Sequence, residues 1–162
     1  LRRQRQMCIR DRYYTMSRRF DMQTSARNQF LGTVSAVKKG AVNAEVILDI
    51  GNGAELAAII TNDSADHLAL EVGSEAYALV KAQWIILTVE TNFKTSARNS
   101  LTGTVVRCQE GAVNAEVVIE LPGGKTVASI ITNESVKTLG LKEGLRATAM
   151  IKASHIILAV PA

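Results

Sequence analysis

The sequence contains an internal repeat that accounts for almost everything after residue 23. The segment TSARNQFLGTVSAVKKGAVNAEV, which begins at Thr24, returns as TSARNSLTGTVVRCQEGAVNAEV from Thr95. The register then holds to the end without a gap, and about half of the aligned positions are identical. Self-similarity over this length indicates two homologous domains. We place the first at residues 23–90 and the second at residues 95–162, joined by VETNFK.

Each copy reads as a series of short strands. In the first copy, residues 32–37 and 42–50 alternate or run apolar and are rich in β-branched side chains, and Gly40 lies between them. This pattern predicts a hairpin. The next turn is predicted at GNG (51–53) in the first copy and at PGG (122–124) in the second. A third strand follows at 54–60 in the first copy and at 125–131 in the second.

A short helix is expected after the third strand. Asn62 or Ser64, and Asn133 or Ser135, are good N-cap residues for a helical turn that carries Leu68 and Leu70, or Leu139 and Leu141. Gly73 and Gly144 then release the chain into a fourth and a fifth strand. The fold class predicted is all-β, with two tandem five-stranded barrels of the OB type, each carrying one short helix. Closing the sheet protects edges that so small a domain would otherwise expose.

The net charge of +4 is concentrated in the first residues. Residues 1–23 carry seven arginines against two aspartates, whereas residues 24–162 carry 12 basic and 13 acidic side chains. The repeat region is therefore close to neutral, and its charge does not favour a nucleic-acid partner. Residues 1–22 show no apolar period, and we expect a disordered or non-native basic tail there. The alternative is a basic arm that binds nucleic acid.

The cysteine spacing and the hydropathy pattern indicate the cellular compartment of the protein. Cys8 and Cys108 have no CxxC spacing and no clustered histidines, which supports neither a metal site nor a disulfide framework. No apolar run reaches the roughly 18–20 residues of a membrane span, and the arginine-rich start lacks the apolar core of a secretory signal. We expect a cytoplasmic protein with no membrane partner.

Four motifs recur in order in both copies: TSARN, then GxVxxxxxGxVNAEV, then AxITNxS, then KAxxxII. Together they are similar to the Mop domain of molybdate-binding proteins, and the resemblance spans residues 24–90 and 95–161. Two such copies with little else resemble the molbindins. That resemblance implies a cytoplasmic binder of molybdate or tungstate that assembles as a homo-oligomer, expected to be a trimer, without an organic cofactor.

In the Mop family the oxyanion lies between domains, held by the start of one domain and by the ends of the third and fourth strands of a neighbour. The resemblance implies the same six positions in each copy, with no substitution between the copies. They are Ser25, Arg27, Thr61, Ser64, Lys81 and Ala82 in the first copy, and Ser96, Arg98, Thr132, Ser135, Lys152 and Ala153 in the second. Nearby, Trp84 stands opposite His155 in the alignment of the copies, which predicts unequal packing at the two classes of site.

The chemistry of these residue types suits a tetrahedral dianion. Molybdate has no proton to donate at neutral pH, so its site needs hydroxyl, amide and ammonium donors, and the charged donor makes the stronger bond. Backbone N–H groups at a helix start add partial positive charge. Asp63 and Glu134 would repel the ion and are expected to point away from it.

Without the resemblance, most of these residues have an ordinary structural interpretation. Serine and threonine beside a helix start usually cap it, and a lysine within an apolar strand usually protects an edge. Asn43 and Asn114 are candidates either for bonding the backbone at the turn or for binding the ligand. His67 and His155 have no partners at metal spacing, so no direct cation site is predicted.

Three function classes remain. The leading hypothesis is a stand-alone oxyanion store. The alternative is the ligand-sensing half of a molybdate-responsive transcription regulator without its DNA-binding domain, which an upstream helix-turn-helix pattern would reveal. The regulatory tail of a molybdate transport ATPase would require an ATP-binding motif upstream. We predict that the protein is not an enzyme, because the sequence shows no recognisable Ser/His/Asp set, carboxylate pair or activated cysteine.

Overall fold

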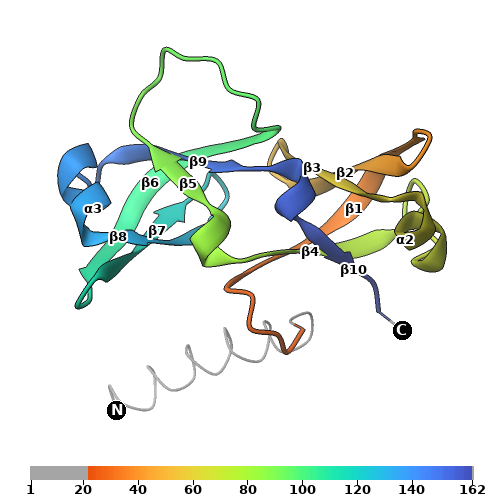
Figure 1. Cartoon of the computed structure of the whole chain (residues 1–162), viewed down its shortest axis with the longest axis horizontal. Coiled ribbons are helices and arrows are strands. Elements are labelled where there is room, and N and C mark those ends of the chain that lie inside the picture. The colour runs from red at the N-terminus through yellow and green to blue at the C-terminus, as the bar shows by residue number, and fades with distance from the viewer. Residues whose placement is uncertain (1–21, 162) are drawn as a thin grey trace.

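The computed structural model describes residues 22–161 and contains two five-stranded antiparallel sheets, one in each lobe of the molecule (Figure 1). The first copy supplies β1 (Asn28–Lys39), β2 (Asn43–Gly51), β3 (Ala54–Thr61), β4 (Glu75–Val80) and β5 (Ile86–Thr88). The second copy supplies β6 (Asn99–Glu110), β7 (Asn114–Glu120), β8 (Thr126–Thr132), β9 (Arg146–Ile151) and β10 (Ile157–Ala159). The expected all-β class and the tandem barrel-like units are confirmed.

The predicted hairpin forms in both copies. β1 pairs with β2 around Gly40, whose N–H donates to the Asn43 carbonyl at 2.7 Å, and β2 continues into β3 through the GNG turn. Gly32 is required inside β1, because a Cβ there would lie 2.5 Å from the Asp49 carbonyl oxygen. Gly103 has the same role in β6, with a Cβ position 2.2 Å from the Glu120 carbonyl oxygen. The two long strands therefore cross their partners more closely than any larger residue allows.

The fifth strands are exchanged between the copies. The sheet order is β10-β4-β1-β2-β3 in one lobe and β5-β9-β6-β7-β8 in the other. β5 follows β4 after a single 3-10 turn, η1 (Ala82–Trp84), and β10 follows β9 after η2 (Ala153–His155). These turns carry the chain onward to the other lobe, where each short strand completes the neighbouring sheet (Figure 1). The sequence predicts five strands per copy, but it does not reveal that one of the five is shared.

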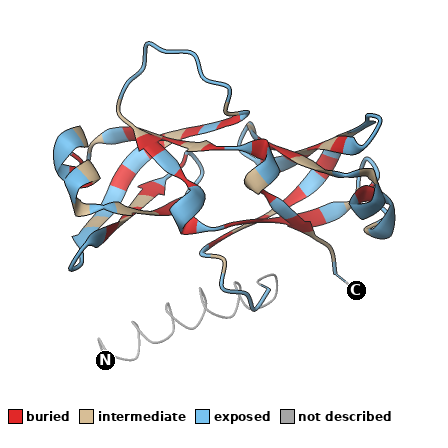
Figure 2. Cartoon of the chain, in the orientation of Figure 1, coloured by how far each residue is buried: buried red, intermediate tan, exposed pale blue. Residues whose placement is uncertain are grey.

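The core runs through both lobes as one cluster of buried apolar side chains. Its largest fully buried members are aliphatic residues such as Leu48, Leu56, Ile119 and Ile151. Buried and exposed residues alternate along the strands, while the hairpin tips and the loop joining the copies are exposed (Figure 2). Because each sheet includes a strand from the other copy, neither half of the repeat buries its core alone.

The helices begin one residue earlier than a cap at Asn62 or Asn133 predicts, and three residues earlier than a cap at Ser64 or Ser135 predicts. α2 (Asn62–His67) is capped by Thr61 and α3 (Asn133–Leu139) by Thr132, so the expectation that Asn62 or Ser64, and Asn133 or Ser135, would be the N-cap was wrong. The cap hydroxyl accepts from the backbone N–H three residues on, and an asparagine or serine within the first turn cannot do this. Leu68 forms the C-cap of α2. Leu70 and Leu141 lie beyond the helices.

The prediction for residues 1–22 falls almost entirely on residues 1–21, which lie outside the described part of the chain. Among residues 22–161, no helix has the length and apolar character needed to cross a membrane. The same residues contain no group of three or more metal-ligating side chains.

Candidate functional site

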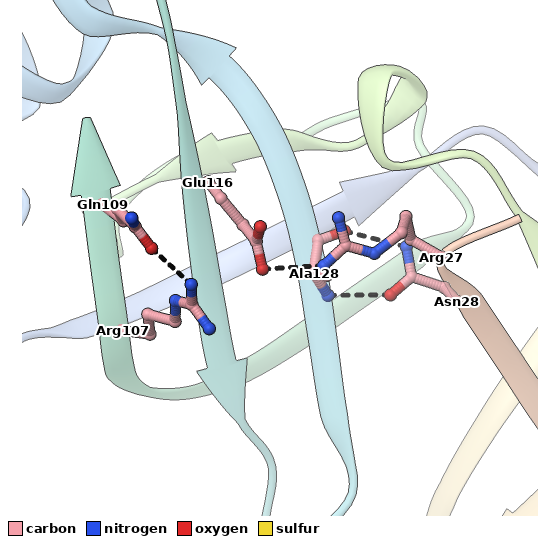
Figure 3. A network of polar contacts seen from close by, with 6 residues as sticks. All are labelled: Arg27, Asn28, Arg107, Gln109, Glu116 and Ala128. Atoms are coloured by element: carbon pink, nitrogen blue, oxygen red, sulfur yellow. Dashed lines mark hydrogen bonds and ion pairs between the residues drawn. The ribbon is translucent and has the colours of Figure 1, made fainter. Parts of the chain in front are cut away.

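The start of each copy lies against the third strand of the other copy. Asn28, 3% exposed, donates from Nδ2 to the Ala128 carbonyl at 2.8 Å, and its Oδ1 accepts from the Ala128 N–H at 2.7 Å (Figure 3). Nδ2 also reaches the Val80 carbonyl at 3.3 Å. Asn99 makes the equivalent contacts with Ala57, at 2.9 and 2.7 Å. Each asparagine thus binds β8 or β3 as another strand would.

Beside these asparagines, two ion pairs also join the copies. Arg27 donates to Glu116 on β7 at 2.7 Å (Figure 3), and Arg98 donates to both carboxylate oxygens of Glu45 on β2, at 2.7 and 2.9 Å. The guanidinium of Arg98 holds the pKa of Glu45 below its usual value, against the opposing effect of desolvation. Arg27 lowers the pKa of Glu116 in the same way. The arginines expected to bind an anion therefore already hold a carboxylate.

The predicted lysines occupy matching places. Lys81 immediately precedes η1 and is exposed, while the next residue, Ala82, is buried. The Lys81 ammonium lies 5.8 Å from the centre of the Trp84 ring. η1 packs against β8 of the other copy, where Ser129 donates to the Ile85 carbonyl at 3.2 Å. Lys152 and Ala153 repeat this arrangement beside β3.

The capping residues form a second group at the ends of the third strands. The Thr61 and Ser64 hydroxyls lie 2.8 Å apart, and the Ser64 N–H donates to Thr61 Oγ1 at 3.1 Å. Thr132 and Ser135 repeat the geometry at 2.9 and 3.1 Å. Thr61 and Ser64 line a cavity of about 560 Å³ together with Ser154, which follows Ala153 of the other copy. The cavity therefore joins a helix start from one copy to the 3-10 turn of the other.

Asp63 lines the same cavity as Thr61 and Ser64 and lies in the first turn of α2. The expectation that Asp63 and Glu134 point away from a bound ion stays a prediction. His67 lines this cavity as well. A dianion in that cavity would meet hydroxyl donors together with one carboxylate, unless a further positive group entered from outside.

The structure brings the predicted residues into two groups rather than one. Arg27 and Lys81 lie close to each other, since Asn28 pairs with Val80, and both adjoin the middle of β8. Thr132, which caps α3, lies four residues beyond Ala128 on β8. Four residues of a strand span about 13 Å. The cavity lined by Thr61 and Ser64 contains no residue from either TSARN segment. A single chain thus presents parts of a site at separate places.

Several residues at these contacts were missed by sequence reasoning. Asn28 and Asn99 belong to the identical TSARN strings, and Glu45 and Glu116 to the identical NAEV strings. The exact repetition of these two strings was the sequence signal that could have identified the four residues as important. Nothing in the sequence indicates that the TSARN string of one copy meets the NAEV string of the other.

The remaining candidates have mainly structural contacts. The backbone carbonyl of Asn43 accepts a hydrogen bond from the Gly40 N–H in the turn. The side chain that bonds this turn belongs to Asn62, which donates to the Gly40 carbonyl at 2.9 Å. Trp84 and His155 occupy equivalent positions in the two copies, and they are also in contact, with ring centres 5.2 Å apart. His155 Nδ1 is buried and has no hydrogen-bond partner among the described residues. A ligand role for Asn43 and Asn114 stays a prediction.

Comparison with known proteins places the repeat in a family. The family model described as the TOBE domain matches residues 24–87 and again residues 95–158. The molybdenum transport protein ModE of Azotobacter vinelandii is 46% identical over 139 residues, which cover 86% of this chain and 52% of that protein. The molybdenum-pterin-binding protein MopA of Rhodobacter capsulatus is 44% identical over 141 residues, covering 86% and 53%. The chain spans about half the length of these curated relatives.

The fold is also found in a solved structure. The cytoplasmic molybdate-binding protein ModG, crystallised with molybdate bound, is 53% identical and superimposes with a TM-score of 0.84, covering 86% of this chain and 100% of that one. The resemblance to the Mop domain, which rested on the repeated motifs, is confirmed. This chain belongs to the TOBE-domain family and carries two of its domains in tandem.

Proposed function

We propose that this chain binds molybdate or tungstate and serves as a cytoplasmic store of the oxyanion rather than as an enzyme. The observation that carries the proposal is its likeness to molybdate-bound ModG, which extends over the whole of that chain at 53% identity. The donors expected for such an ion are present in both copies: hydroxyls at the helix starts, lysines before the 3-10 turns, and arginines at the start of each copy.

The two groups of residues support binding between chains. One group, containing Arg27, Lys81 and Ala82, adjoins β7 and β8 of the other copy, and the other, containing Thr61 and Ser64, opens to solvent at the end of β3. A tetrahedral dianion loses its hydration shell on binding, so every oxygen needs a donor. We infer that a second chain supplies the missing donors, in a homotrimer whose interfaces complete the sites.

The charges already present shape how the anion would bind. Arg27 uses one nitrogen for Glu116, and a guanidinium has five N–H donors, so donors remain for an oxyanion. Asp63 lines the Thr61 cavity, where its carboxylate would repel a dianion. A lysine or arginine that enters from a neighbouring chain would offset that carboxylate, which again favours an assembled site.

A second candidate function has its own support. Relatives from several bacteria are named as ModE transcriptional regulators, for example that of Escherichia coli (strain K12) at 35% identity over 143 residues, and the chain covers 53% of that protein. The chain would then correspond to the sensing half of a regulator. The complete coding sequence decides between the two, because a regulator requires a helix-turn-helix segment joined to this repeat.

Calorimetry with molybdate, tungstate, sulfate and phosphate tests the binding proposal. We expect molybdate and tungstate to bind and the double variant Lys81→Ala with Lys152→Ala to lose tight binding while it keeps the β-sheet circular dichroism spectrum. The matched control is Lys94→Ala with Lys142→Ala, which removes two exposed lysines outside the proposed set. Unchanged affinity in the Lys81/Lys152 variant would refute the site. Sedimentation tests the assembly, since a trimer has about three times the 17.5 kDa of one chain.

A further inference from the structure

A separate cavity of about 530 Å³ lies between the copies on the β1 side. It is lined by residues 27–31 at the start of β1, by Tyr77 on β4, and by Lys125 and Thr126 at the start of β8. Its size falls within the roughly 300–1,000 Å³ of pockets that hold small organic molecules. A four-oxygen ion would fill only a small part of it.

Lys125 gives this cavity an unusual charge. Its ammonium donates to the backbone carbonyls of Ile50 and, at 3.5 Å, of Leu31, so both of its protein partners are neutral. Burial lowers the pKa of Lys125, and the charge of Asp49 only partly opposes this. Arg27 is the other cation in the lining, and no lining residue is acidic. An ammonium has three N–H donors, so one remains for a ligand.

The apolar part of the lining lies beside these cations. Phe30 and Tyr77 are 3% and 8% exposed, and with Leu31 they form the apolar wall of the cavity. Pockets for small organic molecules combine apolar and aromatic side chains with a few polar groups that fix the orientation of the ligand. Here the apolar side chains would contact the body of an organic acid, and the ammonium would bind its acidic end.

The repeat provides an internal comparison. The corresponding cavity on the other side, of about 320 Å³, is lined by Ala54, Glu55, Ser100, Leu101 and Thr102, among others, and Lys125 reaches it as well. Ala54 stands where Lys125 stands, and Glu55 where Thr126 stands. Leu101 replaces Phe30, and Thr148 replaces Tyr77. The fold alone therefore produces a cavity on both sides, and Lys125 lines both. The two aromatic rings and a lining without a carboxylate occur only in the larger cavity.

We propose that the cavity around Lys125 binds a small aromatic carboxylate, with its carboxylate on the Lys125 ammonium and its ring against Phe30, Leu31 and Tyr77. A charge-assisted hydrogen bond to a partly desolvated ammonium is stronger than one between neutral groups. Arg27 belongs both to this lining and to the residues proposed for molybdate, whereas Lys125, Phe30, Leu31 and Tyr77 lie outside that set. A change at Lys125 therefore tests this site without altering a proposed oxyanion residue.

The test uses 2-naphthoate as the probe and isothermal calorimetry on the full chain. We expect one molecule bound per chain, with affinity at least tenfold weaker in Lys125→Met, which keeps the apolar stem and removes the charge. The uncharged analogue 2-naphthamide should also bind at least tenfold more weakly to the unaltered chain. Lys142→Met, at an exposed lysine away from the cavity, should bind 2-naphthoate normally.

A second variant comes from the repeat itself. Thr126→Glu copies Glu55 of the first copy and places a carboxylate in the lining without altering Lys125, so it should abolish 2-naphthoate binding. Unchanged circular dichroism and unchanged molybdate affinity in both variants establish that they fold. The proposal is overturned if the unaltered chain takes up no 2-naphthoate at millimolar concentration, if Lys125→Met or Thr126→Glu binds it equally well, or if the amide binds as tightly as the acid.

Discussion

Asn28 pairs with Ala128 through two hydrogen bonds, one donated and one accepted, although 100 residues separate them in the chain. The side chain satisfies both backbone groups of a residue in the middle of a strand that has β7 on its other side. Asn99 does the same for Ala57. These paired contacts, together with the exchanged fifth strands, make the two copies one folded unit.

Replacing Asn28 by alanine should destabilise the whole chain. Ala128 would keep a buried N–H and a buried carbonyl without their partner, and each unsatisfied group costs about 1–3 kcal/mol. Denaturant unfolding should show a clear loss of stability in Asn28→Ala, with the two copies still unfolding in one transition. Asn92→Ala, in the exposed joining loop, is the control. Equal midpoints for these two variants would contradict the role assigned to Asn28.

The Arg98–Glu45 pair predicts a dependence of stability on pH. The pKa of Glu45 is lowered in the folded chain, so the pair stabilises the fold above the ordinary glutamate pKa of about 4.3 and loses that contribution as the pH falls through the folded value. Glu45→Gln should therefore be less stable than the unaltered chain at pH 7, and the difference should shrink in acid. Urea unfolding at several pH values measures it. A difference that stays constant down to pH 3 would show that the ionised pair contributes nothing.

Gly103→Ala should weaken the contact between β6 and β7. The added Cβ would lie 2.2 Å from the Glu120 carbonyl oxygen and 2.7 Å from the side chain of Ile119, so the strands must separate. Overpacking of this kind costs roughly 1–3 kcal/mol. Thermal unfolding should show a lower Tm than in Thr104→Ala, whose side chain is exposed at the next position. Gly32→Ala should behave in the same way, since its Cβ would lie 2.5 Å from the Asp49 carbonyl oxygen.

Cutting the loop between the copies should leave them associated. Residues 90–96 are exposed and form the long green loop between β5 and β6 in Figure 1. A protease site inserted between Asn92 and Phe93 should be cleaved without loss of the fold, because β5 and β10 remain in each other's sheets. Size-exclusion chromatography should show both fragments in one peak under native conditions and two in denaturant. Separation of the fragments without denaturant would contradict the exchange.

Much of the local structure was predictable from particular residues. Gly40 and the GNG and PGG segments marked the turns, and alternation along 32–37 and 42–50 marked the hairpin, because these signals depend on the chain within a few residues. The predicted N-cap was one or three residues away from the observed cap at Thr61, since several neighbouring side chains are good caps and only the backbone geometry selects one. The twelve proposed oxyanion residues rest on the family resemblance, and the structure adds the surroundings of the arginines, the capping residues and the lysines.

The repeat in the sequence determined by itself that there are two copies of one all-β unit, because hydrophobic period and turn residues act locally and are written twice. Only the tertiary structure decided which copy each fifth strand joins, that Asn28 meets Ala128, and that Lys125 lies half-buried against carbonyls of the other copy. The physical reason is that a strand or a buried amide is satisfied equally well by either of two nearly identical partners. Local sequence cannot distinguish them, and the packing of the assembled chain does.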